Sequence, residues 1–265
     1  MGSGIAEVCA RAELDVVIVE TDAAAAGRAR ARVERSLERA VERQKVDERI
    51  AAVHDYAALG DRDIVIEAVT ERKDVKLGVF QRLAEALERP DAILASNTSS
   101  IPIVELGAVA GERADHVLGL HFFNPVPVLS LVEIIPSLLT GGAVVERARR
   151  FATEQLAKEP IVAPDRAGFT VNALLIPYLL SAIRMFEQGL ASAEDIDTGM
   201  VKGCAHPMGP LALADLIGLD TVLGVAETLY AEHRESAYAP PPLLQRLVAA
   251  GLLGRKSQRG LYSYG

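Results

Sequence analysis

Short runs of aliphatic and β-branched residues, each separated from the next by a helix-like segment, constrain the fold of the first half of the chain. These runs lie at residues 14–20, 63–69, 92–96, 117–121 and 131–135. Helix-like stretches occupy residues 23 to about 43, 74–88 and 143 to about 158. Nearly uninterrupted apolar strands that alternate with helices are typical of a parallel sheet covered on both faces. The pattern therefore predicts an α/β fold with a doubly wound sheet.

The second half of the chain has a different pattern. From Gly168 onward there is no β-branched run, and helical periodicity covers residues 172–187, 193–202, 211–232 and 243–250. Proline and glycine punctuate the gaps, as expected between helices. We therefore expect an α/β domain at residues 1–164 and an all-helical domain at residues 165–265.

Composition and charge argue against several classes of protein. The net charge of −8 disfavours a nucleic-acid partner, because such proteins usually carry a basic face for the phosphates. The longest apolar stretch, residues 169–183, is too short to span a bilayer, so no membrane association is expected. Cys9 and Cys204 lie far apart and outside any ligand spacing, which argues against a disulfide or a metal site. These features favour a cytoplasmic α/β protein.

The beginning of the chain carries part of a dinucleotide-binding motif. In a Rossmann fold, a strand ends in Gly-x-Gly-x-x-Gly, a helix follows, and an acidic residue about 20 positions on binds the adenosine ribose. Gly2 fits the third glycine, and Glu20, 18 positions later, fits the acidic residue, which would favour NAD over NADP. The first strand and the first two glycines are not in the sequence. The half-motif alone therefore fits equally well a flexible start and an ordinary charge at a strand end.

Longer motifs carry a resemblance to a known family. They are Ser96-Asn-Thr-Ser-Ser-Ile101, His121-Phe-Phe-Asn-Pro125, Leu131-Val-Glu-Ile-Ile135, Asp165-Arg-Ala-Gly-Phe-Thr-Val-Asn172, Lys202-Gly-Cys-Ala-His-Pro-Met-Gly-Pro-Leu211, Asp215-Leu-Ile-Gly-Leu-Asp220 and Gly254-Arg-Lys-Ser-Gln-Arg-Gly-Leu-Tyr-Ser-Tyr264. In order and spacing they resemble the 3-hydroxyacyl-CoA dehydrogenase family, and within it most closely the bacterial 3-hydroxybutyryl-CoA dehydrogenases. The resemblance implies a Rossmann domain whose first strand is missing from this sequence, followed by a helical domain. It also implies NAD-dependent interconversion of 3-hydroxyacyl-CoA and 3-ketoacyl-CoA.

The same resemblance places the acid–base chemistry on His121 and Glu133. Oxidation of a secondary alcohol needs a base with a pKa near neutrality, which suits histidine. His121 ends a predicted strand, at the edge where ligands bind in open α/β sheets, and Glu133 follows 12 residues later in another apolar run. A carboxylate paired with the imidazole would fix its tautomer and stabilise the imidazolium. Without the motif, His121 would fit a satisfied core residue and Glu133 an edge charge.

Ser100 and Asn172 match the other two polar site residues of the family. We expect them to hydrogen-bond the 3-oxygen or the thioester carbonyl of the substrate. By themselves both would be interpreted as helix caps. Because Asn172 belongs to the predicted helical domain, catalysis should require both domains to close on each other.

Further positions match the family's contacts with its ligands. For the cofactor, NAD, these positions are Gly2, Glu20, Glu71, Lys76 and Asn97. For the CoA moiety they are Ser36, Arg43 and Lys45, where cations would suit the phosphates. Glu71 and Lys76 equally fit exposed residues at the start of a helix, and the CoA set equally fits a solvated charged helix.

Other functions stay open at this point. β-Hydroxyacid dehydrogenases transfer the proton with a lysine early in the helical domain, but residues 168–187 contain no lysine. A non-catalytic family member, either a pseudoenzyme or a scaffold, is the alternative, because the cofactor-binding start is incomplete. Rossmann geometry predicts instead that the functional product begins about 15 residues upstream and that Met1 is an internal methionine. The resemblance further implies a homodimer formed through the helical domain.

Overall fold

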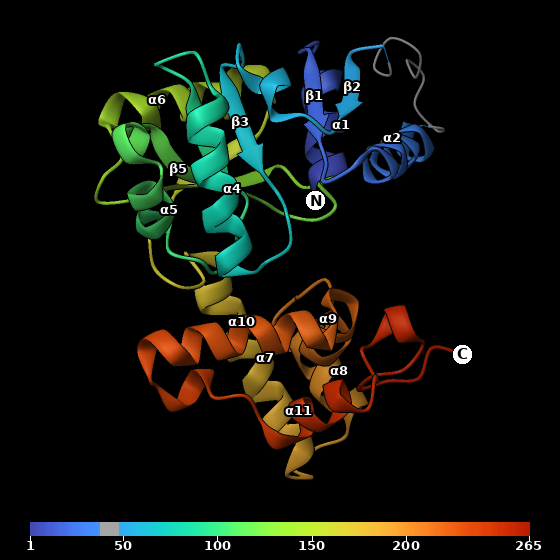
Figure 1. Cartoon of the computed structure of the whole chain (residues 1–265). Coiled ribbons are helices and arrows are strands. Elements are labelled where there is room, and N and C mark those ends of the chain that lie inside the picture. Colours follow the sequence, from blue (N-terminus) through green and yellow to red (C-terminus); the bar gives the residue numbers. More distant parts are fainter. Residues whose placement is uncertain (38–47) are drawn as a thin grey trace. The chain divides into compact units, whose positions relative to one another are not determined.

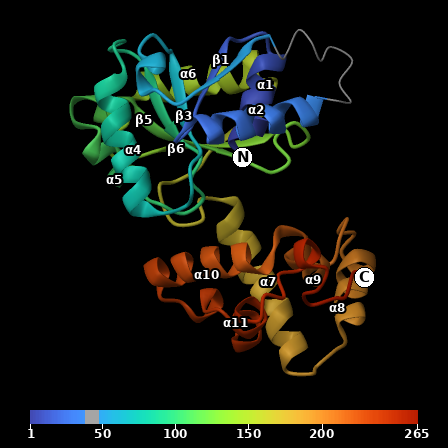
Figure 2. The ribbon, with the colours of Figure 1, turned by 45° about the vertical axis from the view of Figure 1, so that its right-hand side comes forward.

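A computed structural model describes residues 1–37 and 48–265 of the chain. It consists of two compact units, Met1–Asp165 and Arg166–Gly265 (Figures 1 and 2). The first unit alternates strands and helices and the second is helical, so the predicted fold class is confirmed. Within the described ranges, none of the helices combines the length and the apolar character needed to cross a membrane.

The first unit is built on two sheets. Its strands are β1 (Val16–Val19), β2 (Ile50–Val53), β3 (Ile64–Glu67), β4 (Ile93–Ser96), β5 (Val117–Phe122), β6 (Leu131–Pro136) and β7 (Glu159–Val162). β1 and β2 form a parallel pair, and the other sheet has the order β3-β4-β5-β6-β7. Each apolar run found in the sequence thus forms a strand.

Two strands were not predicted, for identifiable reasons. β2 is only four residues long and two of them are alanine, which has a low strand preference. β7 lies at the edge of its sheet and contains Pro160, which lacks a backbone N–H and is tolerated in strands mainly at edges. By contrast, every residue of β4 and of β5 is buried, which accounts for their continuous apolar sequences.

The expectation of a wholly parallel sheet was wrong at one pair. β5 and β6 are antiparallel, whereas β3–β4, β4–β5 and β6–β7 are parallel. Residues 123–130 connect β5 to β6 and contain no helix. A parallel crossover needs a dozen or more residues, usually including a helix. This connection is too short for one, so β6 runs antiparallel to β5.

Helices cover the two sheets of the first unit. They are α1 (Gly2–Arg11), α2 (Ala23–Leu37), α4 (Lys73–Ala86), α5 (Ile103–Val109) and α6 (Gly142–Arg150), the last continuing as a π-helical turn at Phe151–Gln155. Ile5 of α1 and Val144 of α6 share a hydrophobic cluster with Leu118 and Leu120 of β5. The short α5 was not predicted; its first N–H groups, of Ile103 and Val104, donate to the Asp165 carboxylate at 2.7 and 2.8 Å.

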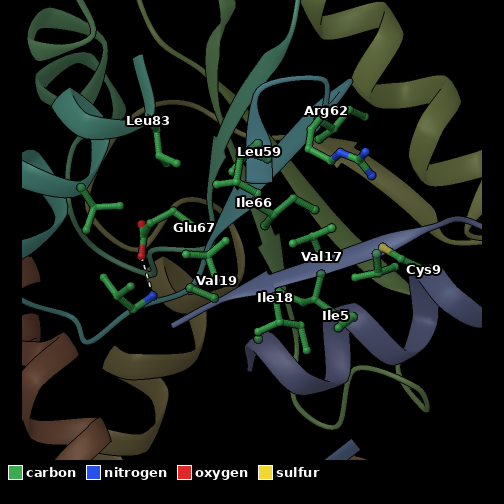
Figure 3. A pocket seen from close by; sticks show the side chains of 18 of the residues that line it. Ile5, Cys9, Val17, Ile18, Val19, Leu59, Arg62, Ile66, Glu67 and Leu83 are labelled. Atoms are coloured by element: carbon green, nitrogen blue, oxygen red, sulfur yellow. Dashed lines mark hydrogen bonds between the residues drawn. The ribbon is translucent and has the colours of Figure 1, made fainter. Parts of the chain in front are cut away.

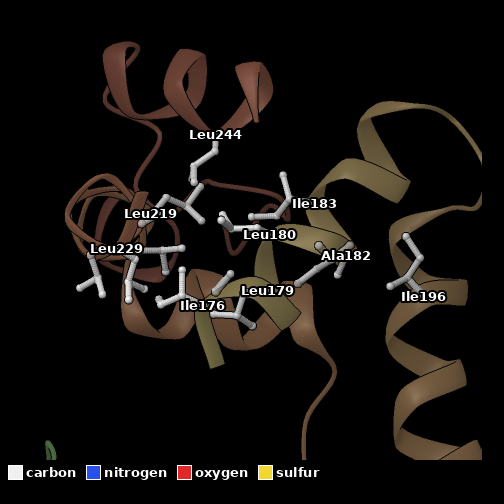
Figure 4. Packing of buried hydrophobic residues seen from close by; sticks show 14 of the residues in the cluster. Ile176, Leu179, Leu180, Ala182, Ile183, Ile196, Leu219, Leu229 and Leu244 are labelled. Carbon is white, nitrogen blue, oxygen red and sulfur yellow. The ribbon is translucent and has the colours of Figure 1, made fainter. Parts of the chain in front are cut away.

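The second unit consists of helices around one apolar core (Figure 4). They are α7 (Val171–Glu187), α8 (Ala193–Gly203), α9 (Pro210–Ile217), α10 (Leu219–His233) and α11 (Pro242–Ala249). Leu179 and Ile183 of α7 pack in this core with Leu219 and Leu229 of α10. The single helix predicted over residues 211–232 is divided at Gly218, whose φ of 103° is outside the helical range.

A buried carboxylate anchors the end of the chain to this helical unit. Asp215 accepts hydrogen bonds of 2.9 Å from the backbone N–H groups of Leu261 and Tyr262 and from the Tyr264 hydroxyl. A Cβ atom at Gly260 would lie 2.1 Å from Asp215 Oδ1, so only glycine allows this approach. The C-terminal segment is therefore held by hydrogen bonds to one side chain.

Substituting Asp215 with alanine should lower the free energy of unfolding by roughly 3 kcal/mol, because it leaves several donors without an acceptor. Urea denaturation followed by circular dichroism measures this loss. Asp220→Ala is the matched control, since that carboxylate is 40% exposed and pairs with Lys256 at the surface. Such a pair contributes roughly 0–1 kcal/mol. Equal losses in the two variants would contradict the anchoring role of Asp215.

The two sheets are not joined by strand pairing. In the described part of the chain, β1 pairs only with β2, and β3 at its own sheet edge pairs only with β4. A cavity of about 1590 Å³ is lined by every residue of β1 and of β3, with α1 and α4 also contributing (Figure 3). Each of these strands therefore presents one row of backbone groups toward a cavity instead of a neighbouring strand.

Candidate functional site

A histidine and a glutamate face each other on neighbouring strands. In the antiparallel register, His121 of β5 lies directly opposite Glu133 of β6. His121 Nδ1 lies 2.7 Å from Glu133 Oε2, and the glutamate side chain is 0% exposed. The ring of Phe123 packs edge-on against the imidazole, with 4.6 Å between ring centroids. The Glu133 carboxylate thus favours the tautomer that carries a proton on Nδ1.

Ser100 belongs to a cluster of hydroxyl groups around Glu71. Glu71 Oε1 accepts hydrogen bonds from Thr98 Oγ1, from the N–H of Ser99 and from Ser100 Oγ at 3.1 Å. Burial raises the pKa of the Glu71 carboxyl, but the Thr98 hydrogen bond and the nearby Lys76 charge outweigh it, and the pKa is lowered. Glu71 is therefore an ionised acceptor that orders the loop after β4.

Lys76 lies inside this part of the molecule rather than at its surface. Its side chain is 1% exposed, and its Nζ lies 2.7 Å from Glu67 Oε1 and 3.3 Å from Glu71 Oε2. Glu67 was not identified from the sequence as a site residue. The signal that could have revealed it is a glutamate at the end of an apolar strand, as with Glu133, because a buried carboxylate needs a partner.

Asn97 connects two neighbouring strands. It directly follows β4, and its Oδ1 accepts a 2.8 Å hydrogen bond from the backbone N–H of Phe122, the last residue of β5. This contact orients the amide at the carboxyl ends of these two parallel strands, the edge where α/β proteins bind their ligands.

Gly2 and Glu20 both line the cavity that is bordered by β1 and β3. Gly2 is the first residue of α1, whose N-terminus has no side-chain cap, and Glu20 directly follows β1. An uncapped helix N-terminus suits a pyrophosphate, and a carboxylate after the strand suits the hydroxyls of an adenosine ribose. The residues present therefore fit NAD, as the half-motif in the sequence predicts.

The remaining predicted residues are Ser36, Arg43, Lys45 and Asn172. Ser36 of α2 donates its hydroxyl hydrogen bond to Glu7 of α1, a contact within the first unit that sequence analysis did not anticipate. Arg43 and Lys45 lie outside the described residues. Asn172 is the second residue of α7, in the helical unit, and is partly buried.

Comparison with known proteins identifies the family. The family model "3-hydroxyacyl-CoA dehydrogenase, NAD binding domain" matches residues 1–166, and "3-hydroxyacyl-CoA dehydrogenase, C-terminal domain" matches residues 168–264. A 3-hydroxybutyryl-CoA dehydrogenase of Mycobacterium tuberculosis is 51% identical over 272 residues, which cover 100% of this chain and 95% of that protein.

Solved structures agree with this result. The crystal structure of M. tuberculosis FadB2 superimposes with a TM-score of 0.98 at 50% identity, covering 100% of this chain and 95% of the other. That of (S)-3-hydroxybutyryl-CoA dehydrogenase PaaH1 from Ralstonia eutropha gives a TM-score of 0.93 at 44% identity, with the same coverage. The chain therefore belongs to the 3-hydroxyacyl-CoA dehydrogenase family, and its first unit is that family's NAD-binding domain.

Proposed function

We propose that this chain is an NAD-dependent dehydrogenase that interconverts (S)-3-hydroxyacyl-CoA and 3-ketoacyl-CoA, with 3-hydroxybutyryl-CoA as its substrate. The observation that carries the proposal is the buried pair of His121 and Glu133, 2.7 Å apart at neighbouring strands. The names of the similar proteins from M. tuberculosis and R. eutropha support the choice of the four-carbon substrate.

In this proposal His121 moves the proton. With Nδ1 donating to Glu133, Nε2 takes the proton of the 3-hydroxyl group during oxidation and returns it during reduction. Glu133 holds the ring and stabilises the imidazolium that the transfer creates. NAD, when bound, supplies the acceptor for the hydride that leaves C3.

Ser100 and Asn172 complete the proposed set of polar residues. Their hydroxyl and amide groups would donate to the 3-oxygen, on which negative charge develops in the transition state, or would hold the thioester carbonyl. Ser100 Oγ donates to Glu71 Oε1 at 3.1 Å, so its single hydroxyl proton would turn from the carboxylate to the substrate oxygen when the substrate arrives.

The direct test is NADH oxidation with acetoacetyl-CoA and with longer 3-ketoacyl-CoA thioesters. We would measure this chain beside a form extended at its N-terminus by an aliphatic strand and a glycine turn. Turnover that is fastest with acetoacetyl-CoA supports the proposal. Absence of turnover with every thioester in both forms would overturn it and favour the non-catalytic alternative.

Glu20 should set the preference for the cofactor. Its carboxylate would accept from the ribose hydroxyls and repel a 2′-phosphate. Glu20→Ala should therefore lower the ratio of kcat/KM for NADH over NADPH by about tenfold or more, since a like-charge contact costs several kcal/mol. Asp61→Ala, which removes another carboxylate that lines the cavity, should leave the ratio unchanged. An unaltered ratio in Glu20→Ala would exclude this role.

We further propose a cytoplasmic homodimer that associates through the helical unit. Leu174, Leu190 and Leu216 of this unit are 73%, 69% and 49% exposed, which supports an apolar contact surface. Both cysteines are free, as expected in a reducing compartment. Sedimentation equilibrium would give the mass of the particle, and a monomer at micromolar concentration would argue against the dimer.

A further inference from the structure

A row of buried charges lies at the carboxyl ends of β3 and β4, apart from the His121–Glu133 pair. Glu67, the last residue of β3, is paired in register with Ser96, the last residue of β4. The side chains of Glu67 and Lys76 are 0% and 1% exposed. Charges buried to this extent are retained only with partners that satisfy them.

Each carboxylate oxygen of Glu67 holds two donors. Oε1 accepts from the N–H of Val69 at 2.6 Å and from Lys76 Nζ at 2.7 Å. Oε2 accepts from Ser96 Oγ at 2.6 Å and from Lys76 Nζ at 3.0 Å. Glu67, seen in the wall of the cavity in Figure 3, thus connects the ends of two strands with helix α4.

Lys76 contacts a second carboxylate, that of Glu71. An ammonium group has three N–H donors. Besides Glu67, its neighbours are Glu71 Oε2 at 3.3 Å and the carbonyl oxygen of Val69 at 3.4 Å. The Lys76 ammonium therefore has acceptors on Glu67, on Glu71 and on the Val69 carbonyl. Because two carboxylates attract it, the position of Nζ depends on both of them.

Glu71 is the last member before the loop that follows β4. Its Oε1 accepts from Ser100 Oγ at 3.1 Å, while its Oε2 faces Lys76. An unbroken series of hydrogen bonds and ion pairs thus runs from Glu67 through Lys76 and Glu71 to Ser100.

We propose that Glu67 is a positioning residue: by sharing Lys76 with Glu71, it sets the place of the Glu71 carboxylate and thereby the position of Ser100, which donates to that carboxylate and is expected to contact the substrate. The part of this proposal that concerns substrate rests on the proposed function. The coupling of Glu67 to Glu71 does not.

Glu67→Gln removes the negative charge of this side chain but keeps its size and shape. The amide oxygen can keep the contacts with Val69 N–H and Lys76, while the amide NH₂ can donate to the Ser96 hydroxyl, which is able to accept. The buried ammonium then keeps Glu71 as its charged partner and moves toward it. The substitution therefore changes the place of Glu71 while the core remains filled.

The kinetic test is a double-mutant cycle with acetoacetyl-CoA and NADH. Glu67→Gln should lower kcat/KM for acetoacetyl-CoA by about 10- to 100-fold, the scale of a misplaced contact. In a Ser100→Ala background the same substitution should have less than about a twofold effect, because the group through which it acts is gone. Equal fold-losses in both backgrounds would overturn the proposal, since a purely structural role is additive.

A second measurement does not depend on turnover. The pKa of Glu71, followed by ¹³C carboxyl shifts, should fall in Glu67→Gln, because a neighbouring like charge has been removed and Lys76 is no longer shared. Glu67→Asp, which shortens the side chain but keeps its charge, should give a smaller fall and serves if the glutamine variant does not fold. Glu105→Gln, at an exposed ion pair with Lys73, should change nothing.

An unchanged Glu71 pKa in both Glu67 variants would overturn the coupling. Absence of turnover in the parent protein would instead defeat the proposed function, and the titration would still decide whether Glu67 and Glu71 are coupled. The two failures are therefore distinguishable.

Discussion

His121→Ala should lower kcat for acetoacetyl-CoA reduction by about 10²- to 10⁴-fold, the range that a positioned general acid or base contributes. The affinity for NADH should change little, because His121 is proposed to move a proton at the substrate, whereas Gly2 and Glu20, which fit the pyrophosphate and the ribose, lie at α1 and after β1. Steady-state kinetics together with fluorescence titration of NADH separate the two quantities.

His116→Ala is the matched control for this result. His116 immediately precedes β5 and contacts Asp115 near the surface, so it shares the neighbourhood of His121 but not its buried partner. Its replacement should leave kcat within about twofold of the parent value, as is usual for surface positions. Normal turnover in His121→Ala would remove this histidine from the mechanism.

Lys76→Met should lower the free energy of unfolding by about 3–5 kcal/mol, the usual cost of removing one partner of a buried ion pair. The methionine fills the space of the lysine stem, but the buried carboxylate of Glu67 loses Lys76, the cation that lies 2.7 Å from it. Urea unfolding monitored by circular dichroism gives the change in midpoint and slope.

Removing both charges should restore most of this stability. In the double variant Glu67→Gln/Lys76→Met neither charge of the buried pair remains, and the amide still satisfies Val69 and Ser96. Glu71 also loses Lys76, but its side chain is 39% exposed and keeps its hydrogen bonds from Thr98 and Ser99. Buried ion pairs replaced as a pair often cost little. A double variant as unstable as Lys76→Met alone would show that lost packing, and not the unpaired charge, causes the destabilisation.

The pairing of His121 with Glu133 could be expected from the resemblance, but the strand arrangement that produces it could not. His121 and Glu133 stand out because each interrupts an apolar run. Their pairing depends on the antiparallel return of β6, which places them opposite each other. A parallel sheet, the arrangement predicted from the strand–helix alternation, would have required a long crossover between them.

Contacts between side chains that lie on different elements were not predicted. Glu67 gains its buried partner only in the folded chain, where α4 places Lys76 within hydrogen-bond distance of the end of β3. Ser36, for which a contact with CoA stays a prediction, donates a hydrogen bond to Glu7, a contact that the sequence did not reveal. Helical periodicity predicts that a residue belongs to a helix, but the neighbour that its side chain contacts follows from tertiary packing.

In the part of the chain that the structure describes, β1 and β3 each have one edge that pairs with no strand, and these edges bear on how the protein behaves at high concentration. Strand edges with unsatisfied N–H and C=O groups are templates for the addition of further extended chains, and proteins usually protect them with lysine or proline. β1 has the sequence Val-Val-Ile-Val and contains neither lysine nor proline. The one charged residue of β3, Glu67, is paired with the buried Lys76. At high concentration, an extended segment of another molecule that pairs with these edges would therefore lead to aggregation.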